Sequence, residues 1–139
     1  MGRLAALALS VTLGALPQVV SAATCNWPAW DSYKKAMMSA DGRIIDSSSA
    51  QLITTSEGQS YGLFFALVGN DRQGFAKILD WTRNNLAQGN LDKHLPAWQW
   101  GQSKSGKWQV LDSNNASDSD LWIAYSLSLI HISEPTRPY

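Results

Sequence analysis

The stretch SEGQSYGLFFALV, residues 56–68, sets the expected fold. Its second half is almost entirely apolar and Gly69 ends the run, so the spacing predicts a helix that is buried on nearly every side. Its first four residues have the S-x-x-Q form of a capping box, which places the helix start at Ser56 with Gln59 bonding back to it. A helix of this kind requires other helices around it.

Helical patterns continue on both sides of this segment. A proline is favoured at a first helical position, and apolar residues recur at helical spacing behind Pro28, which predicts a helix over 28–39. Asp71 can cap a further helix, in which apolar residues from Phe75 to Leu86 lie opposite a polar face. Because the link before Asp71 is so short, we expect these two helices to pack antiparallel.

The middle of the chain has a different pattern. Residues 97–100 and 107–111 alternate at period two around a turn-rich stretch, 103–106, which predicts a β-hairpin with Trp98 and Trp100 on one face. Helical periodicity resumes near Leu121. The expected fold is therefore all-α with a small β-hairpin.

The first 22 residues have the form of a signal peptide. Arg3 supplies the positive charge, residues 4–16 supply a short apolar run, and Val20-Ser21-Ala22 fits the cleavage rule with Ala22 as the last residue removed. The apolar run is too short to span a hydrocarbon core of about 30 Å. We therefore expect export to the periplasm or the medium, with no membrane attachment after cleavage.

Composition narrows the class of partner. The 139 residues carry a formal net charge of zero, which disfavours nucleic acid, and the seven Trp offer flat faces that stack well on sugar rings. Cys25 is the only cysteine, so no disulfide can form within the chain. His94 stands alone outside the C-terminal stretch, and no cluster has metal-ligand spacing, so we expect neither a metal nor a cofactor.

The C-terminal stretch, residues 130–139, loses the helical pattern where a helix should continue, and it contains Pro135 and Pro138. Our hypothesis is that this stretch is not native to the protein. Residues 23–129 would then be the N-terminal portion of a longer domain.

Outside that stretch Glu57 is the only glutamate, and it falls in the first turn of the apolar helix. One interpretation is a capping charge, which the helix macrodipole stabilises. The other is a general acid, which must hold its proton at neutral pH although the helix end favours the anion. A second carboxylate nearby, or burial among aromatic residues, would favour the protonated form.

Asp118 and Asp120 could supply that carboxylate, because both lie where the next helix should start. They serve equally well as helix-capping acids, with Asp118 or Ser117 as the N-cap and Asp120 in the first turn. The catalytic interpretation requires the two helix starts to point into one cleft. Alternate helices of an α/α barrel meet this requirement, because they begin at the same end of the barrel.

Two segments carry a specific resemblance. Residues 54–62, TTSEGQSYG, and residues 116–127, ASDSDLWIAYSL, resemble the signature segments of glycoside hydrolase family 8, the cellulase D family. The resemblance covers about residues 24–127. Parts of it, such as residues 79–82 and 84–89, resemble the periplasmic endoglucanases that accompany bacterial cellulose synthase. It implies the N-terminal part of an (α/α)6 barrel, here truncated, and inverting hydrolysis of β-1,4-glucan.

The resemblance also implies roles for single residues. Glu57 would protonate the leaving glycosidic oxygen, while Asp118 would grip and distort the sugar and keep Glu57 protonated. Tyr61, Asp120 and Trp98 would bind substrate, with Trp98 as a stacking platform. The family's general base lies downstream and has no match in these 139 residues, so we expect this chain by itself to be inactive. Expected partners are cellulose and the machinery that synthesises or exports it.

Three alternatives stay open. The chain could belong to a non-catalytic module that holds glucan by aromatic stacking, or to a helical structural protein whose acids only cap helices. It could also belong to a family hydrolase that acts on chitosan or xylan.

Overall fold

The computed structural model describes residues 27–133, with side chains as far as Ile130. The expected signal peptide, Cys25 and residues 134–139 lie outside this range. The described elements, in chain order, are α1 (Pro28–Met37), β1 (Thr54–Thr55), α2 (Ser56–Val68), α3 (Arg72–Asn85), β2 (Gln99–Gln102), β3 (Trp108–Asp112) and α4 (Ser117–Ser133).

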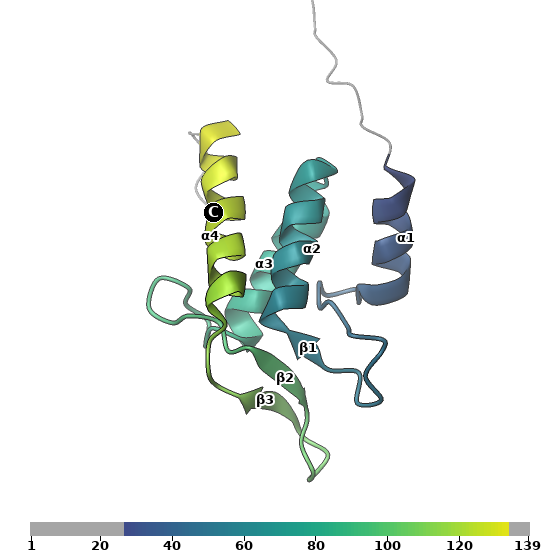
Figure 1. The fold of residues 1–139 in the computed structure, drawn as a ribbon, viewed down its shortest axis with the longest axis vertical. Helices are drawn as coiled ribbons and strands as arrows, with labels where there is room; N and C mark the ends of the chain where they lie inside the picture. The colour runs from purple at the N-terminus through teal and green to yellow at the C-terminus, as the bar shows by residue number, and fades with distance from the viewer. Residues whose placement is uncertain (1–26, 134–139) are drawn as a thin grey trace, which may run out of the picture.

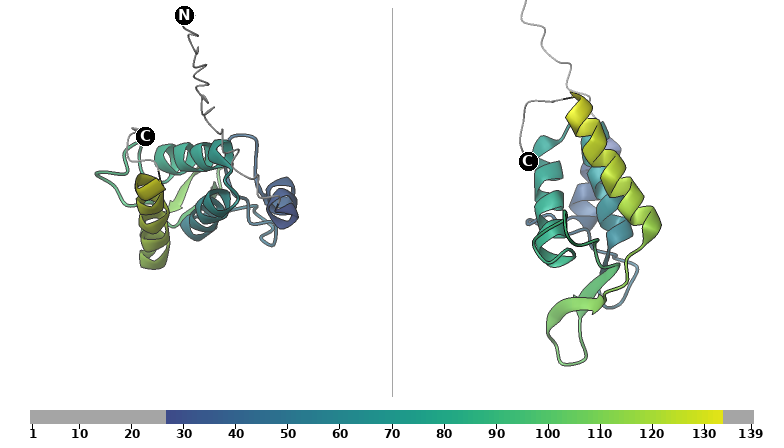
Figure 2. Two further views of the ribbon diagram at one scale, coloured as in Figure 1. Left: turned by 90° about the horizontal axis from the view of Figure 1, so that it is seen from above. Right: turned by 90° about the vertical axis from the view of Figure 1, so that its left-hand side faces the viewer.

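The helices alternate in direction. α2 and α4 both begin beside the small sheet and run away from it, whereas α1 and α3 run towards it (Figure 1). The predicted antiparallel packing of α2 and α3 is therefore confirmed. α2 packs against both α3 and α4, and it lies between α1 and α4 when the helices are seen end-on (Figure 2). The starts of α2 and α4 consequently share one end of the molecule.

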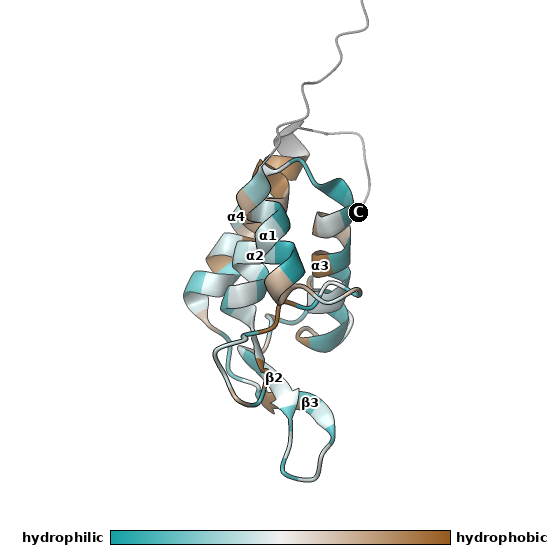
Figure 3. Ribbon diagram, turned by 90° about the vertical axis from the view of Figure 1, so that its right-hand side faces the viewer, coloured by the Kyte–Doolittle hydropathy of each residue, from teal (hydrophilic) through white to brown (hydrophobic). Residues whose placement is uncertain are grey.

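The sheet is larger than predicted. The hairpin of β2 and β3 is confirmed, but β1 adds a third antiparallel strand, with Thr54 opposite Trp100 and Thr55 opposite Gln99. The expectation of an all-α fold with a hairpin alone is thus corrected to a mostly helical fold with a three-stranded sheet. The tip of the hairpin is hydrophilic and points away from the helices (Figure 3).

The start of α2 also differs from the prediction, because Thr55 is the N-cap. Its hydroxyl accepts a hydrogen bond from the backbone N–H of Gly58 at 3.1 Å. The capping box on Ser56 is therefore wrong. Strand β1 runs directly into the helix, and the N–H of Ser56 donates to the carbonyl of Trp98 at 2.9 Å, so the cap falls one residue earlier.

Gln59 has a tertiary role in place of the predicted capping role. Its side chain is fully buried, and its Oε1 accepts a hydrogen bond from the N–H of Ile44 at 2.6 Å. Its Nε2 donates to the Thr82 hydroxyl at 2.9 Å and, at 3.3 Å, to the carbonyls of Gly42 and Ile78. One amide group thus joins α2 to α3 and to the loop that follows α1.

Gly42 allows that loop to approach α3 closely. Its φ is +97°, and a Cβ at this position would lie 2.3 Å from the backbone of Lys77. A larger residue would be strained in φ and would clash with backbone atoms. This close approach brings Ile44 into the core, which consists of Trp30, Ile44, Leu63, Ala66, Phe75, Ile78, Leu79 and Ile123.

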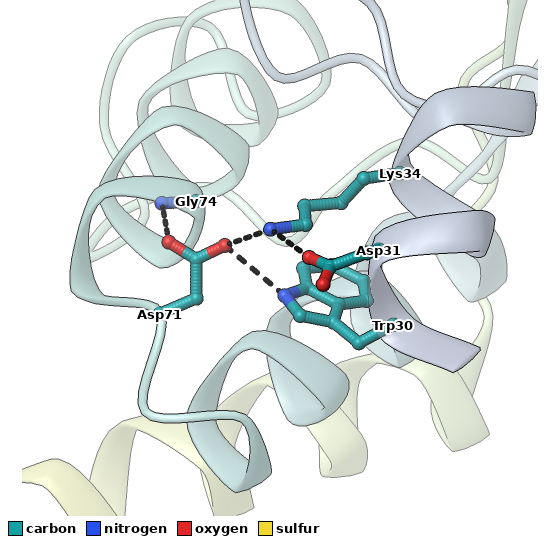
Figure 4. Close-up of polar contacts among 5 residues, drawn as sticks. All are labelled: Trp30, Asp31, Lys34, Asp71 and Gly74. Carbon is teal, nitrogen blue, oxygen red and sulfur yellow. Dashed lines mark hydrogen bonds and ion pairs between the residues drawn. The ribbon is translucent and has the colours of Figure 1, made fainter. Parts of the chain in front are cut away.

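Asp71 joins α1 to the start of α3 (Figure 4). Its carboxylate accepts hydrogen bonds from the N–H of Gly74 at 2.8 Å, the indole of Trp30 at 3.0 Å and the ammonium of Lys34 at 2.8 Å. The predicted N-cap is confirmed. Burial alone would raise the pKa of Asp71, but these donors outweigh it and the pKa is lowered.

Two helices differ from the prediction: α2 is more exposed to solvent than expected, and α4 is longer than expected. α2 is not buried on every side, because Tyr61 and Val68 are exposed. α4 begins at Ser117, earlier than the expected start near Leu121, and it continues to Ser133, past the point where the pattern is lost in the sequence. In the described part of the chain no helix has the length and apolar content that crossing a membrane requires.

Candidate functional site

Glu57 and Asp118 lie at the shared end of α2 and α4. Glu57 is in the first turn of α2 and Asp118 in the first turn of α4, and both side chains are exposed. Because the two helices pack together and run parallel, their first turns, 61 positions apart in sequence, lie at the same end of the molecule (Figure 1). Thr55 is the N-cap, so Glu57 does not occupy the cap position, but it lies in the first turn, where the helix macrodipole stabilises an acid.

Tyr61 is within electrostatic reach of both acids. Its hydroxyl donates a hydrogen bond to Oε1 of Glu57 at 3.0 Å, one helical turn away along α2. That hydrogen bond and the charge of Glu57 raise the pKa of the Tyr61 hydroxyl, and the charge of Asp118 adds to the effect. Of the two carboxylates, Glu57 has the larger effect on this hydroxyl.

An aromatic group from both helices surrounds this position. The ring of Tyr61 stacks on Phe65 with centroids 6.4 Å apart, and it meets the edge of Trp122 at 6.2 Å. Trp122 lies one turn after Asp118 on α4 and also packs on Phe64 at 4.9 Å. Tyr61 and Trp122 are each 37% exposed, so part of both rings faces solvent.

Asp120, in the first turn of α4, contacts the loop that precedes this helix. Its Oδ2 accepts a hydrogen bond from the amide of Asn115 at 2.7 Å, and its Oδ1 is buried without a partner among the described residues. The structure thus brings Asp120 near the start of α4 but ties one of its oxygens to the loop before the helix. A substrate-binding role for Asp120 stays a prediction.

Trp98 is half-buried, immediately before β2. Its backbone is fixed on both sides, since its carbonyl accepts from Ser56 and its N–H donates to the carbonyl of Asn114 at 2.7 Å. A hydrogen bond from the Trp98 side chain, together with the N–H of Asn114, lowers the pKa of the Asp112 carboxyl. Trp98 therefore connects the sheet to the start of α2, and its role as a stacking platform stays a prediction.

A second aromatic group was not foreseen from the sequence. Trp100 stacks on Trp108 with centroids 5.1 Å apart and meets the edge of Trp81 at 5.2 Å. The guanidinium of Arg43 lies over Trp100 at 4.7 Å and over Trp108 at 4.8 Å, and it donates to the Thr54 hydroxyl at 2.7 Å. Arg43 is far from these partners in sequence, so no local spacing could have indicated the contact.

Among the side chains of residues 27–130, no three from His, Cys, Asp or Glu form a group that could hold a metal ion. His94 is exposed, in the segment between α3 and β2. The described side chains near the starts of α2 and α4 are two carboxyl groups, a phenol and the aromatic rings beside it.

The sequence profile described as glycosyl hydrolases family 8 matches residues 5–132. The chain belongs to this family. Among family 8 relatives, it is 63% identical to an endoglucanase of Escherichia coli O157:H7 over 105 residues, which are 76% of this chain. Those residues make up 28% of the relative, so the chain spans little more than a quarter of the length of such proteins.

Solved structures of family 8 agree with this assignment. The endo-1,4-D-glucanase of Vibrio fischeri ES114 is 50% identical, with a TM-score of 0.76 over 80% of this chain and 32% of that chain. A cold-adapted family 8 xylanase is 20% identical, with a TM-score of 0.52 over 61% of this chain and 22% of that chain. The xylanase shares the fold alone.

Proposed function

We propose that the full-length protein hydrolyses β-1,4-glucosidic bonds within cellulose chains, with Glu57 as the proton donor. The observation that carries this proposal is that Glu57 and Asp118 lie in the first turns of α2 and α4, which begin at the same end of the molecule. An exposed carboxyl group can reach a substrate, and general acid catalysis requires a carboxyl group within hydrogen-bond reach of the leaving oxygen.

The reaction is inverting hydrolysis. Glu57 gives its proton to the glycosidic oxygen as the bond from that oxygen to the anomeric carbon breaks, and the leaving sugar keeps the electron pair. Water attacks the anomeric carbon from the opposite face, and a general base accepts its proton. That base belongs to the part of the protein beyond this chain, which would complete an (α/α)6 barrel. Asp118 grips and distorts the sugar at the cleavage point.

The relatives support glucan as the substrate. The proteins to which this chain is 46–63% identical are named endoglucanases, whereas likeness to the xylanase is limited to the fold. Trp98 and Asp120 are the residues we assign to the sugar chain. We further propose that the protein is exported, by the signal peptide at residues 1–22, and acts on cellulose near the machinery that synthesises it.

The decisive experiment is Glu57→Gln in the full-length gene product, assayed on soluble cellulose. Loss of the general acid should lower kcat by roughly 100-fold to 10,000-fold while the variant still binds cellooligosaccharide. The control is Asp80→Asn, which removes an acid from the exposed face of α3 and should retain full activity.

Each outcome separates the alternatives. Unchanged hydrolysis in Glu57→Gln would end the assignment of the acid. A wild-type protein that binds glucan without cleaving it would be the non-catalytic module. A faster reaction on chitosan or xylan than on cellulose would replace the substrate and leave the role of Glu57 intact.

A further inference from the structure

We propose that Tyr61 is a positioning residue for Glu57: it holds one carboxyl oxygen so that the other oxygen delivers the proton. This inference rests on the proposed function and assigns Tyr61 a role that acts through Glu57, in place of direct contact with the sugar.

The first argument is geometric. Tyr61 follows Glu57 by four residues on α2, a spacing that puts both side chains on the same helix face. The phenol O–H donates to Oε1 of Glu57 at 3.0 Å. An exposed glutamate has several rotatable bonds, and fixing it in one orientation costs conformational entropy. The hydrogen bond from a neighbouring side chain offsets that cost before substrate arrives.

The second argument concerns the ring that carries the hydroxyl. Tyr61 stacks on Phe65 of α2 and meets the edge of Trp122 of α4. Because Trp122 lies one turn after Asp118, the contact joins the two helix starts. The ring of Tyr61 thus packs against side chains of both helices. The distance from its hydroxyl to Glu57 therefore depends on how α2 and α4 pack.

The third argument is chemical. An oxygen that accepts a hydrogen bond from a phenol is disfavoured as the site of the acidic proton, so the proton of neutral Glu57 lies on Oε2. That proton passes to the glycosidic oxygen, the bond to the anomeric carbon breaks, and Glu57 becomes an anion. Tyr61 keeps its own proton throughout, in agreement with its raised pKa, and its hydrogen bond to the new anion becomes charge-assisted.

The test is Tyr61→Phe in the full-length gene product, since phenylalanine keeps the ring contacts and removes only the hydroxyl. On cellopentaose, kcat should fall about tenfold or more while KM changes less than about twofold. An aryl cellooligosaccharide with a highly acidic phenol as its leaving group needs little protonation, so the loss on it should be much smaller. Adding Tyr61→Phe to Glu57→Gln should cause little further loss on cellopentaose.

Tyr125→Phe is the matched control. Tyr125 lies on α4, is 50% exposed and packs on Phe64 and Trp122, yet it makes no hydrogen bond to Glu57 among the described residues. Its hydroxyl should be dispensable for kcat on both substrates. A melting temperature equal to wild type in both variants excludes a loss that arises from misfolding.

Three results would overturn the inference. Equal losses on the two leaving groups would mean that Tyr61 does not act through Glu57, and a rise in KM with constant kcat would mean that it binds the sugar. Unchanged kinetics would mean that the hydroxyl has no role. If Glu57→Gln abolishes hydrolysis while Tyr61→Phe does not alter it, the inference about Tyr61 fails and the proposed function stands.

Discussion

Asp71 and Glu57 are acids at the starts of two consecutive helices, at opposite ends of the molecule, and they are held very differently. Asp71 is the N-cap of α3 and accepts hydrogen bonds from Gly74, Trp30 and Lys34 (Figure 4). Glu57 lies one position inside α2, is exposed, and accepts a hydrogen bond from Tyr61. The carboxylate of Asp71 is thus occupied by donors that hold the fold together, whereas the carboxylate of Glu57 is exposed to solvent.

The start of α2 is held by Gln59 instead of by its acid, and this predicts the largest effect on stability. Gln59→Ala removes a buried amide and leaves the N–H of Ile44 and the carbonyl of Gly42 without the hydrogen bonds that Gln59 makes to them, whereas the carbonyl of Ile78 keeps the hydroxyl of Thr82. We expect a loss of roughly 2–4 kcal/mol in the free energy of unfolding, measured by chemical denaturation of the full-length gene product.

Gln73→Ala is the control for that substitution. Gln73 is also a glutamine near a helix start, but it is exposed on α3, and alanine is the better helix former. Its unfolding free energy should stay within about 0.5 kcal/mol of wild type. Equal effects of the two substitutions would mean that the network around Gln59 does not hold α2 in place.

Substitutions of the two acids should have different effects on the free energy of unfolding. Asp71→Ala removes the cap of α3 and the partner of Lys34, and should cost roughly 1–2 kcal/mol. Glu57→Gln removes no cap and should leave the melting temperature unchanged while activity is lost. The comparison breaks if Glu57→Gln destabilises the protein as much as Asp71→Ala does.

The contribution of Asp71 should also depend on pH. Its pKa is lowered in the folded state, so the stabilisation is present above the ordinary carboxyl pKa of 3.8 and is lost as the pH falls through the lower folded value. The difference in unfolding free energy between wild type and Asp71→Asn should therefore shrink in acid. A difference that stays constant across the carboxyl titration range would contradict this assignment.

Local patterns in the sequence predicted the elements better than the contacts between them. The helix behind Pro28, the cap at Asp71 and the hairpin turn at 103–106 each depend on neighbours a few residues away, and each was confirmed. The pairing of β1 with β2 and the network of Gln59 join residues 15 to 46 positions apart. Spacing within one helix or strand contains no information on such pairs.

In the candidate site, too, the sequence indicated single residues better than the contacts between distant ones. Glu57 stands out in the sequence because of its position, and Asp118 because of the family resemblance. The hydrogen bond from Tyr61 to Glu57 could have been suspected from the i, i+4 spacing alone. The contact between Tyr61 and Trp122 could not have been suspected, because it depends on the parallel packing of α2 and α4.

The smallest expected effects test which residue begins α2. Thr55→Ala removes the hydroxyl that accepts from Gly58 and should cost about 1 kcal/mol, as loss of an N-cap usually does. Ser56→Ala removes a buried hydroxyl that has no partner among the described residues, so it should be neutral or slightly stabilising. A capping box on Ser56 predicts the opposite order. Thermal unfolding of the two variants side by side therefore decides whether Thr55 or Ser56 caps α2.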